Sequence, residues 1–125
     1  YMFGKKKESG TPVMHYEGIE GFATDYPCRI EVKGDVFEIR RIKPETTVTL
    51  PMNRIKSFSA LEEKNFMQKY HGTARTTGKS GINKYYLVVE YDKGMLAFWG
   101  TAKEYKQFIA LQYTTNTAAP SHIEL

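Results

Sequence analysis

Hydrophobic and polar residues alternate along most of the chain between Val13 and Trp99. A two-residue period is typical of strands that turn one face to a core and the other to water. In the clearest case Cys28, Ile30 and Val32 alternate with charged residues, and a Gly-Asp turn leads into a second alternating run. The pattern predicts seven strands, at about residues 13–19, 28–33, 36–42, 47–50, 54–61, 84–91 and 95–99.

The period changes after Gly100, where hydrophobic residues recur three or four positions apart. This spacing predicts an amphipathic helix over residues 102–113. Thr101 and Glu104 have the spacing of a capping box, in which the Thr hydroxyl accepts the Glu amide and the carboxylate reaches back to the Thr amide. A terminal helix would cover the apolar opening of an antiparallel meander. The sequence therefore predicts a mainly β fold, a barrel of about seven antiparallel strands capped by one C-terminal α-helix.

Length and composition predict one globular domain: the chain has 125 residues, of which 41% are hydrophobic and 26% charged. The domain is expected at residues 13–113, between a flexible basic segment at residues 1–12 and a polar tail at residues 114–125. No apolar run approaches the roughly 20 residues that span a bilayer, and no signal-peptide pattern follows the N-terminal lysines. A single cysteine, Cys28, fits a reducing compartment. We expect a cytoplasmic protein, either free or at the inner face of the membrane.

Three segments resemble the small bacterial pleckstrin-homology-like (PH-like) domains in their pattern of strand and turn: residues 47–55, 85–91 and 98–104. The resemblance covers about residues 13–113 and concerns strands and turns rather than reactive residues. It implies a capped barrel that acts as an interaction module. Eukaryotic members carry a Trp inside the capping helix, whereas Trp99 precedes it here. We therefore expect Tyr105 and Phe108 to fill the barrel opening.

Two patterns that could indicate a ligand or metal site do not meet the requirements of such a site. Residues 72–80 contain two glycines followed by Lys and Ser, as in a phosphate-binding loop, but five residues rather than four separate the glycines and a strand pattern follows. The histidines, His15, His71 and His122, are scattered and have no partners at metal-ligand spacing. We expect neither a cofactor nor a metal.

Candidates for catalysis are equally incomplete. Cys28 lies on the inward face of a strand, where a cysteine is normally inert, and a pairing with His15 would lack a third orienting group. Glu62 and Glu63 are adjacent, so in a strand they would point to opposite faces. The sequence therefore predicts that the protein is not an enzyme.

Residues 64–84 are polar, rich in glycine and free of Asp and Glu. They are expected to form a long loop, and the residues that could contact an anion or a partner are Lys69, His71, Arg75, Lys79 and Lys84. Long loops inside compact domains are either functional or simply solvated, and both interpretations stay open. The functional interpretation is a contact with phospholipid headgroups, an acidic or phosphorylated protein, or a nucleic-acid backbone.

The loop between the first two strands, residues 20–27, contains no basic residue. Phosphoinositide-binding members of the family use basic residues here and on the flanking strands, so the resemblance disfavours that ligand at the usual site. Phe22 and Tyr26 are expected to be exposed and suited to contacts with a protein or a membrane interface.

The leading hypothesis is a non-catalytic interaction module that binds a protein partner, which includes a second copy of the chain. The alternative is a peripheral membrane module that contacts anionic lipid through residues 64–84 and through Lys5, Lys6 and Lys7. A net charge of +4 is mild. Nucleic acid is the less favoured partner because the chain lacks the aromatic and basic strand face of single-strand binders.

Overall fold

The computed structural model describes residues 10–41, 45–72 and 83–118. Each of its strands begins and ends within two residues of the predicted position. Two helices and a short 3-10 turn, η1, complete the described part. In chain order the elements are β1 (Thr11–Glu17), β2 (Tyr26–Lys33), β3 (Val36–Arg41), β4 (Thr46–Pro51), η1 (Met52–Arg54), β5 (Ile55–Glu62), α1 (Glu63–His71), β6 (Tyr85–Tyr91), β7 (Gly94–Gly100) and α2 (Ala102–Ala118).

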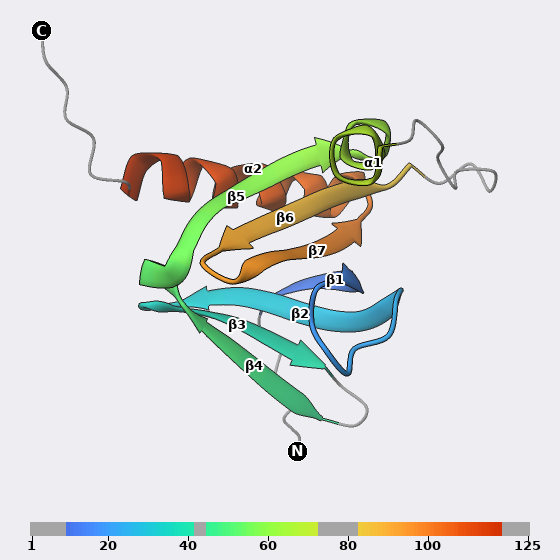
Figure 1. Cartoon of the computed structure of the whole chain (residues 1–125). Coiled ribbons are helices and arrows are strands. Elements are labelled where there is room, and N and C mark those ends of the chain that lie inside the picture. The colour runs from blue at the N-terminus through green and yellow to red at the C-terminus, as the bar shows by residue number, and fades with distance from the viewer. Residues whose placement is uncertain (1–9, 42–44, 73–82, 119–125) are drawn as a thin grey trace, which may run out of the picture.

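The strands form one antiparallel sheet in the order β4-β3-β2-β1-β7-β6-β5. The sheet bends into two layers, with β1 to β4 in one and β5 to β7 in the other (Figure 1). The predicted mainly β architecture with a C-terminal helix is confirmed, and it is consistent with a PH-like barrel or sandwich. The sheet is not closed, however, because β4 and β5 do not pair. Pro51 has no N–H to donate and η1 turns the chain, so the two edge strands diverge.

Helix α2 begins where the capping pattern predicts. The Glu104 carboxylate accepts hydrogen bonds from the Thr101 amide and from the Thr101 hydroxyl, both at 2.7 Å. The Glu104 amide donates to the Thr101 carbonyl at 3.0 Å. The predicted bond from that amide to the Thr101 hydroxyl is therefore wrong, because the hydroxyl turns to the charged acceptor. The helix runs to Ala118, beyond the predicted end at residue 113.

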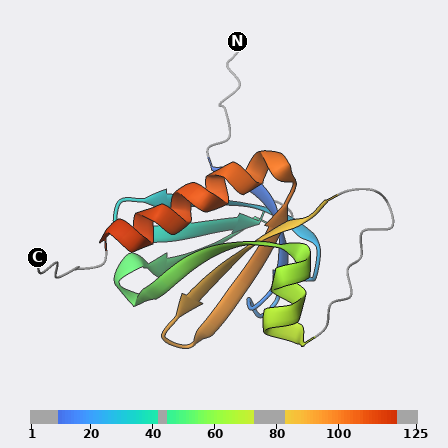
Figure 2. The same cartoon turned by 90° about the horizontal axis from the view of Figure 1, so that it is seen from above.

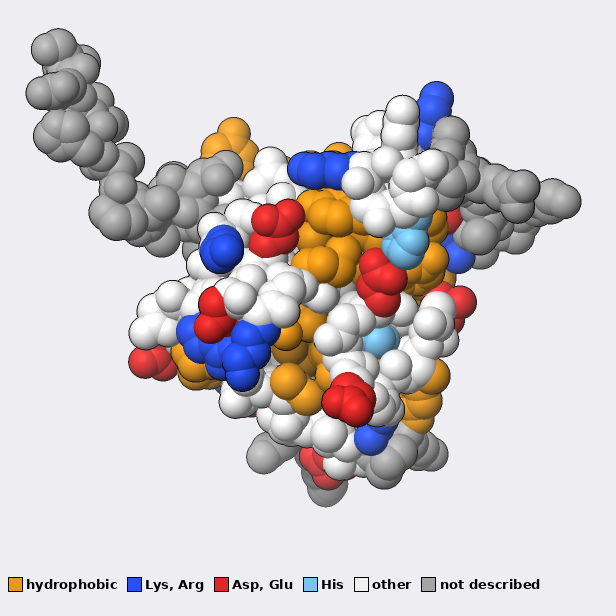
Figure 3. All heavy atoms as spheres, in the orientation of Figure 1, with side chains coloured by type: hydrophobic (Ala, Val, Ile, Leu, Met, Phe, Trp, Pro, Cys, Tyr) orange, Lys and Arg blue, Asp and Glu red, His pale blue; other side chains and the backbone are white. Residues whose placement is uncertain are grey.

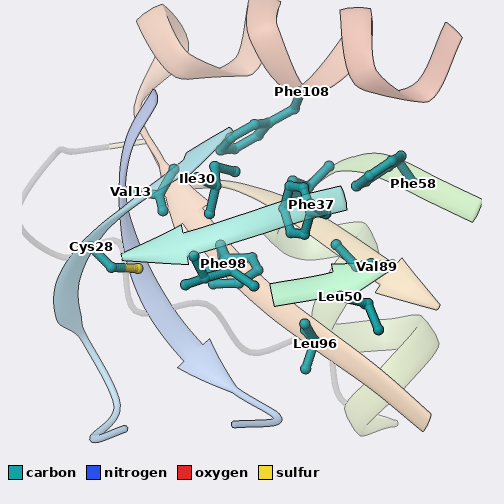
Figure 4. Close-up of a cluster of buried hydrophobic side chains, with 12 residues drawn as sticks. Val13, Cys28, Ile30, Phe37, Leu50, Phe58, Val89, Leu96, Phe98 and Phe108 are labelled. Atoms are coloured by element: carbon teal, nitrogen blue, oxygen red, sulfur yellow. The ribbon is translucent and has the colours of Figure 1, made fainter. Parts of the chain in front are cut away.

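Phe108 of α2 points into the core between the two layers (Figure 4). Its side chain is fully buried, and the core around it includes Phe37, Phe58 and Phe98. The Phe37 ring lies 5.1 Å from Phe58 and 6.4 Å from Phe98, between ring centroids. Tyr105 is half-buried at the edge of this core. The expectation is thus confirmed for Phe108, whereas Tyr105 packs beside the core with its ring stacked on that of Tyr85, 4.3 Å apart between centroids.

The prediction of one continuous loop over residues 64–84 is wrong for its first part, which is helix α1. Phe66 and Met67 of this helix are buried in a second cluster, on the outer face of β6 and β7, whereas α2 covers the inner face. Figure 2 shows the two helices apart. Gly72 ends α1 with a φ of 65°, a left-handed conformation that glycine adopts without strain. Phe66, Met67 and Tyr70 have helical spacing, but they lie within the longer polar stretch of residues 64–84.

Candidate functional site

The described members of the predicted anion-contacting set, Lys69, His71 and Lys84, all contact groups of their own chain. The Lys69 ammonium lies 5.4 Å from the centroid of the neighbouring Tyr70 ring. His71 Nε2 lies 3.0 Å from a Glu17 carboxylate oxygen. The Lys84 ammonium lies 4.4 Å from the centroid of the Trp99 ring in β7. Each therefore has a contact within the domain, although Lys69 and His71 remain exposed, and the remaining two members, Arg75 and Lys79, lie outside the described residues.

An aromatic cluster supports α1 on the sheet. The Phe66 and Tyr86 rings stack with centroids 4.1 Å apart, and Tyr16 packs edge-on against both. The Tyr86 hydroxyl is buried and has no hydrogen-bond partner among the described residues. Burial and the nearby Glu63 carboxylate raise the pKa of Tyr86, so the phenol keeps its proton. Its position favours a packing role.

His15 organises the loop between β1 and β2. Its Nδ1 lies 3.0 Å from the Ala23 carbonyl, and its Nε2 accepts the Ile19 amide at 3.2 Å. This arrangement places the ring proton on Nδ1, because Nε2 must be an acceptor. The imidazole is buried, and burial lowers its pKa, so it is neutral. Sequence reasoning missed this role because both partners are backbone atoms.

Cys28 and His15 do not form a nucleophile and base pair. Both ring nitrogens of His15 are engaged by backbone groups of the loop. The Cys28 thiol is buried, and burial raises the pKa of Cys28 to about 12, which keeps it protonated at neutral pH. In the described part of the chain, no group of three or more His, Cys, Asp or Glu could hold a metal ion.

The expectation that Phe22 and Tyr26 are exposed is wrong, because both side chains are half-buried. Phe22 packs against the core, with its ring edge-on to His15 at 5.4 Å. The Arg41 guanidinium lies 4.6 Å from the Phe22 centroid and 5.6 Å from that of Tyr26. It also donates to the Gly21 carbonyl at 2.9 Å. Arg41 of β3 thus places a cation over the β1–β2 loop, which has no basic residue of its own. The sequence does not reveal this arrangement.

The two segments predicted to bind a partner, residues 20–27 and 64–84, each contribute a residue that contacts Trp99. The Trp99 indole N–H donates to the Asp25 carboxylate at 2.7 Å, which ties the β1–β2 loop to β7. Lys84 lies over the same indole, and the contact between His71 and Glu17 joins α1 to the end of β1. In Figure 3, hydrophobic side chains gather at the centre of the face below α1, with charged and histidine side chains around them.

A cavity of about 390 Å³ opens at the end of the core opposite α2. Its apolar walls come from Ile19, Val48, Leu50 and Leu96. Figure 4 shows Leu50 and Leu96 at the end of the core away from Phe108. At the rim, Arg54 donates from Nε to the Asp92 carboxylate at 3.0 Å, which holds the Asp92 pKa below its usual value. We call this space the mouth cavity.

Strand β4 forms one wall of the mouth cavity and is also an edge of the sheet. Its hydrogen-bonded neighbour is β3, and no other described strand pairs with it. Val48 and Leu50 face inward, whereas the side chains of Thr47 and Thr49 are exposed. The strand carries no charged residue and its register with β3 is continuous.

The backbone of β4 presents hydrogen-bonding groups away from β3. The Met52 amide donates to the Asp35 carbonyl at 2.8 Å, so Met52 points its backbone toward β3. Alternate residues of an antiparallel pair point the same way. The backbone N–H and C=O groups of Leu50 and Val48 therefore also point toward β3, and those of Thr47 and Thr49 point away from it. We call the latter four groups the free edge.

The opposite edge of the sheet, β5, is covered. Helix α2 packs along it, and the Gln112 side-chain oxygen accepts the Ala60 amide at 2.8 Å. A helix that packs along an edge strand and accepts one of its amides obstructs the pairing of another strand there. Of the two edges, β4 is therefore the one that remains open in the described part of the structure.

No protein-family model, no curated protein and no solved structure matches this chain. Neither described helix is long and apolar enough to cross a bilayer. The candidate site therefore rests on the geometry of the structure. It consists of the free edge of β4 and the mouth cavity beside it.

Proposed function

We propose that the chain is a non-catalytic PH-like interaction module that binds a protein partner through the free edge of β4. The observation that carries the proposal is an uncharged, regular edge strand next to an apolar cavity. Partners that add a strand to a sheet gain affinity from backbone hydrogen bonds and specificity from pockets that take side chains. The free edge supplies the first and the mouth cavity supplies the second.

The state of the titratable groups supports a binding role. A nucleophile or general base must reach a substrate with a suitable pKa. Cys28 is buried and protonated, and the ring nitrogens of His15 serve the fold of a loop. Both groups therefore act as structural elements.

The test compares partner capture, from an extract of the source cells, by three forms of the protein. Thr49→Pro removes an outward N–H, and Thr49→Val keeps that N–H while it removes the hydroxyl. Edge positions tolerate proline, so we expect both variants to fold. Partners bound through the edge are captured by the native form and by Thr49→Val and are lost with Thr49→Pro. Equal capture by Thr49→Pro would refute the proposal.

Peripheral membrane binding is the second candidate, and the exposure of Lys64 and Lys69 on α1 favours it. The apolar side chains of the same helix, Phe66 and Met67, are buried against the sheet. Attraction to anionic lipid would then be electrostatic, at about 1 kcal/mol per basic residue near the surface, and would weaken in salt. Co-sedimentation with phosphatidylserine vesicles at low salt tests it, with Lys64→Glu plus Lys69→Glu as the comparison. No binding by the native form, or equal binding by the variant, would exclude this role for α1.

A further inference from the structure

We propose that the free edge of β4 binds the β4 strand of a second copy of this chain, antiparallel, about a two-fold axis through Val48. This inference rests on the proposed function and names its partner. The sheet would continue from one copy into the other, and the two mouth cavities would lie on the same side of the joined strands.

The hydrogen-bond inventory of the free edge is self-complementary. With the axis at Val48, Thr47 of one copy lies opposite Thr49 of the other. The Thr47 amide then donates to the Thr49 carbonyl of the second copy, and the Thr49 amide of the second copy donates back to the Thr47 carbonyl. The symmetric pair repeats these bonds. All outward groups of both free edges are thus satisfied.

The limits of the strand fit this register. Pro51 is the next outward-pointing position after Thr49, and it has no N–H to offer. In this register Pro51 contributes only its carbonyl to the edge, so the absent N–H leaves the four central bonds intact. An axis through Thr49 would also form four bonds, but it would place Thr47 opposite Pro51 and would leave the Thr47 carbonyl of each copy without a donor, whereas the axis through Val48 satisfies all four groups of the free edge. The axis through Val48 is therefore favoured.

The side chains of β4 also favour a second copy. Thr47 and Thr49 would form cross-strand Thr pairs on the exposed face, and such pairs are favourable. The two Val48 side chains would meet on the inner face, beside the apolar walls of the mouth cavities. No charge in the strand opposes its own copy, whereas natural edges are usually protected by charges, bulges or a covering element.

The assembly would close at two copies. A two-fold interface uses the same surface on both copies, and β5, the other edge, is covered by α2. The paired strands are short, so the contact is small beside the roughly 1,200–2,000 Å² of a standard interface. The dimer is accordingly weak, with a dissociation constant in the micromolar to millimolar range.

Sedimentation velocity over a range of concentrations, from micromolar to millimolar, tests the proposal with a matched pair of double variants. Thr47→Lys with Thr49→Lys places like charges opposite each other across the axis. Thr47→Glu with Thr49→Lys places opposite charges there, and each new charge also complements its neighbour on β3, Arg40 or Glu38. We expect the native form to dimerise, the first variant to dimerise at least tenfold more weakly, and the second at least as strongly as the native form.

Three results would overturn the inference: a native form that stays monomeric, a lysine pair that dimerises like the native form, and a Glu-Lys pair that dimerises more weakly. The last would exclude the axis through Val48, because an axis through Thr49 sets like charges opposite each other. Failure here is distinct from failure of the proposed function. A monomer that still loses a captured partner on Thr49→Pro would keep the edge as a binding site for another protein.

Discussion

Replacing Phe108 by alanine tests whether α2 is an integral part of the core. The Phe108 side chain is fully buried among the rings of both layers. Emptying such a site costs about 3–5 kcal/mol, from lost transfer free energy and from the cavity that remains. For a domain of this size, that loss lowers Tm by roughly 10–20 °C. Domains are commonly stable by about 5–15 kcal/mol, so the variant is expected to fold and to remain measurable.

Urea unfolding followed by circular dichroism measures the loss in free energy of unfolding. Lys106→Ala is the matched control, because this residue lies on the same helix and is exposed, and its loss is expected to stay within about 0.5 kcal/mol. Phe108→Leu keeps an apolar side chain and is expected to fall between the two. A loss below about 1 kcal/mol for Phe108→Ala would refute the conclusion that the helix closes the core.

Three further predictions concern other parts of the fold. Burial lowers the pKa of His15 below its ordinary 6.5. The neutral imidazole therefore contributes fully to the free energy of unfolding above about pH 6.5, and this contribution declines as pH falls toward the lowered pKa. Urea titrations at several pH values should show this slope in the native form and not in His15→Phe. Glu104→Ala removes the acceptor of the Thr101 amide and should cost about 1 kcal/mol of unfolding free energy, whereas Glu104→Gln should retain most of it. Gln112→Ala leaves the Ala60 amide without its acceptor and should cost about 1–3 kcal/mol; a thermal melt unchanged from the native form would contradict the cover of β5.

The strands and the start of α2 could be predicted because their signals are local. Alternation along a strand and the capping residues around Thr101 depend on neighbours in sequence, and the structure has them within two residues. Helix α1 also has a local signal, since Phe66, Met67 and Tyr70 follow helical spacing and Gly72 ends the helix. This signal is short, and the polar residues on both sides of it within residues 64–84 outweigh it.

Neither the candidate site nor the contacts that hold the β1–β2 loop could be predicted, because their parts meet only in the folded chain. His15 binds backbone atoms of Ile19 and Ala23, for which no residue type is diagnostic. Arg41 reaches the loop around Phe22 from another strand. The free edge depends on the order of strands in the sheet, and alternation along a strand carries no information about which strand lies outermost.

Strand β6 is buried on both of its faces, since Leu87 and Val89 contact the core while Tyr86 and Val88 support α1. The two apolar clusters therefore share one backbone segment, and neither can open without disturbing the other. Amide protons of β6 should exchange only through global unfolding, at the slowest rates in the molecule. Helix α1 is accordingly an integral part of the domain. Any ligand that loosened α1 would lower the stability of the whole domain.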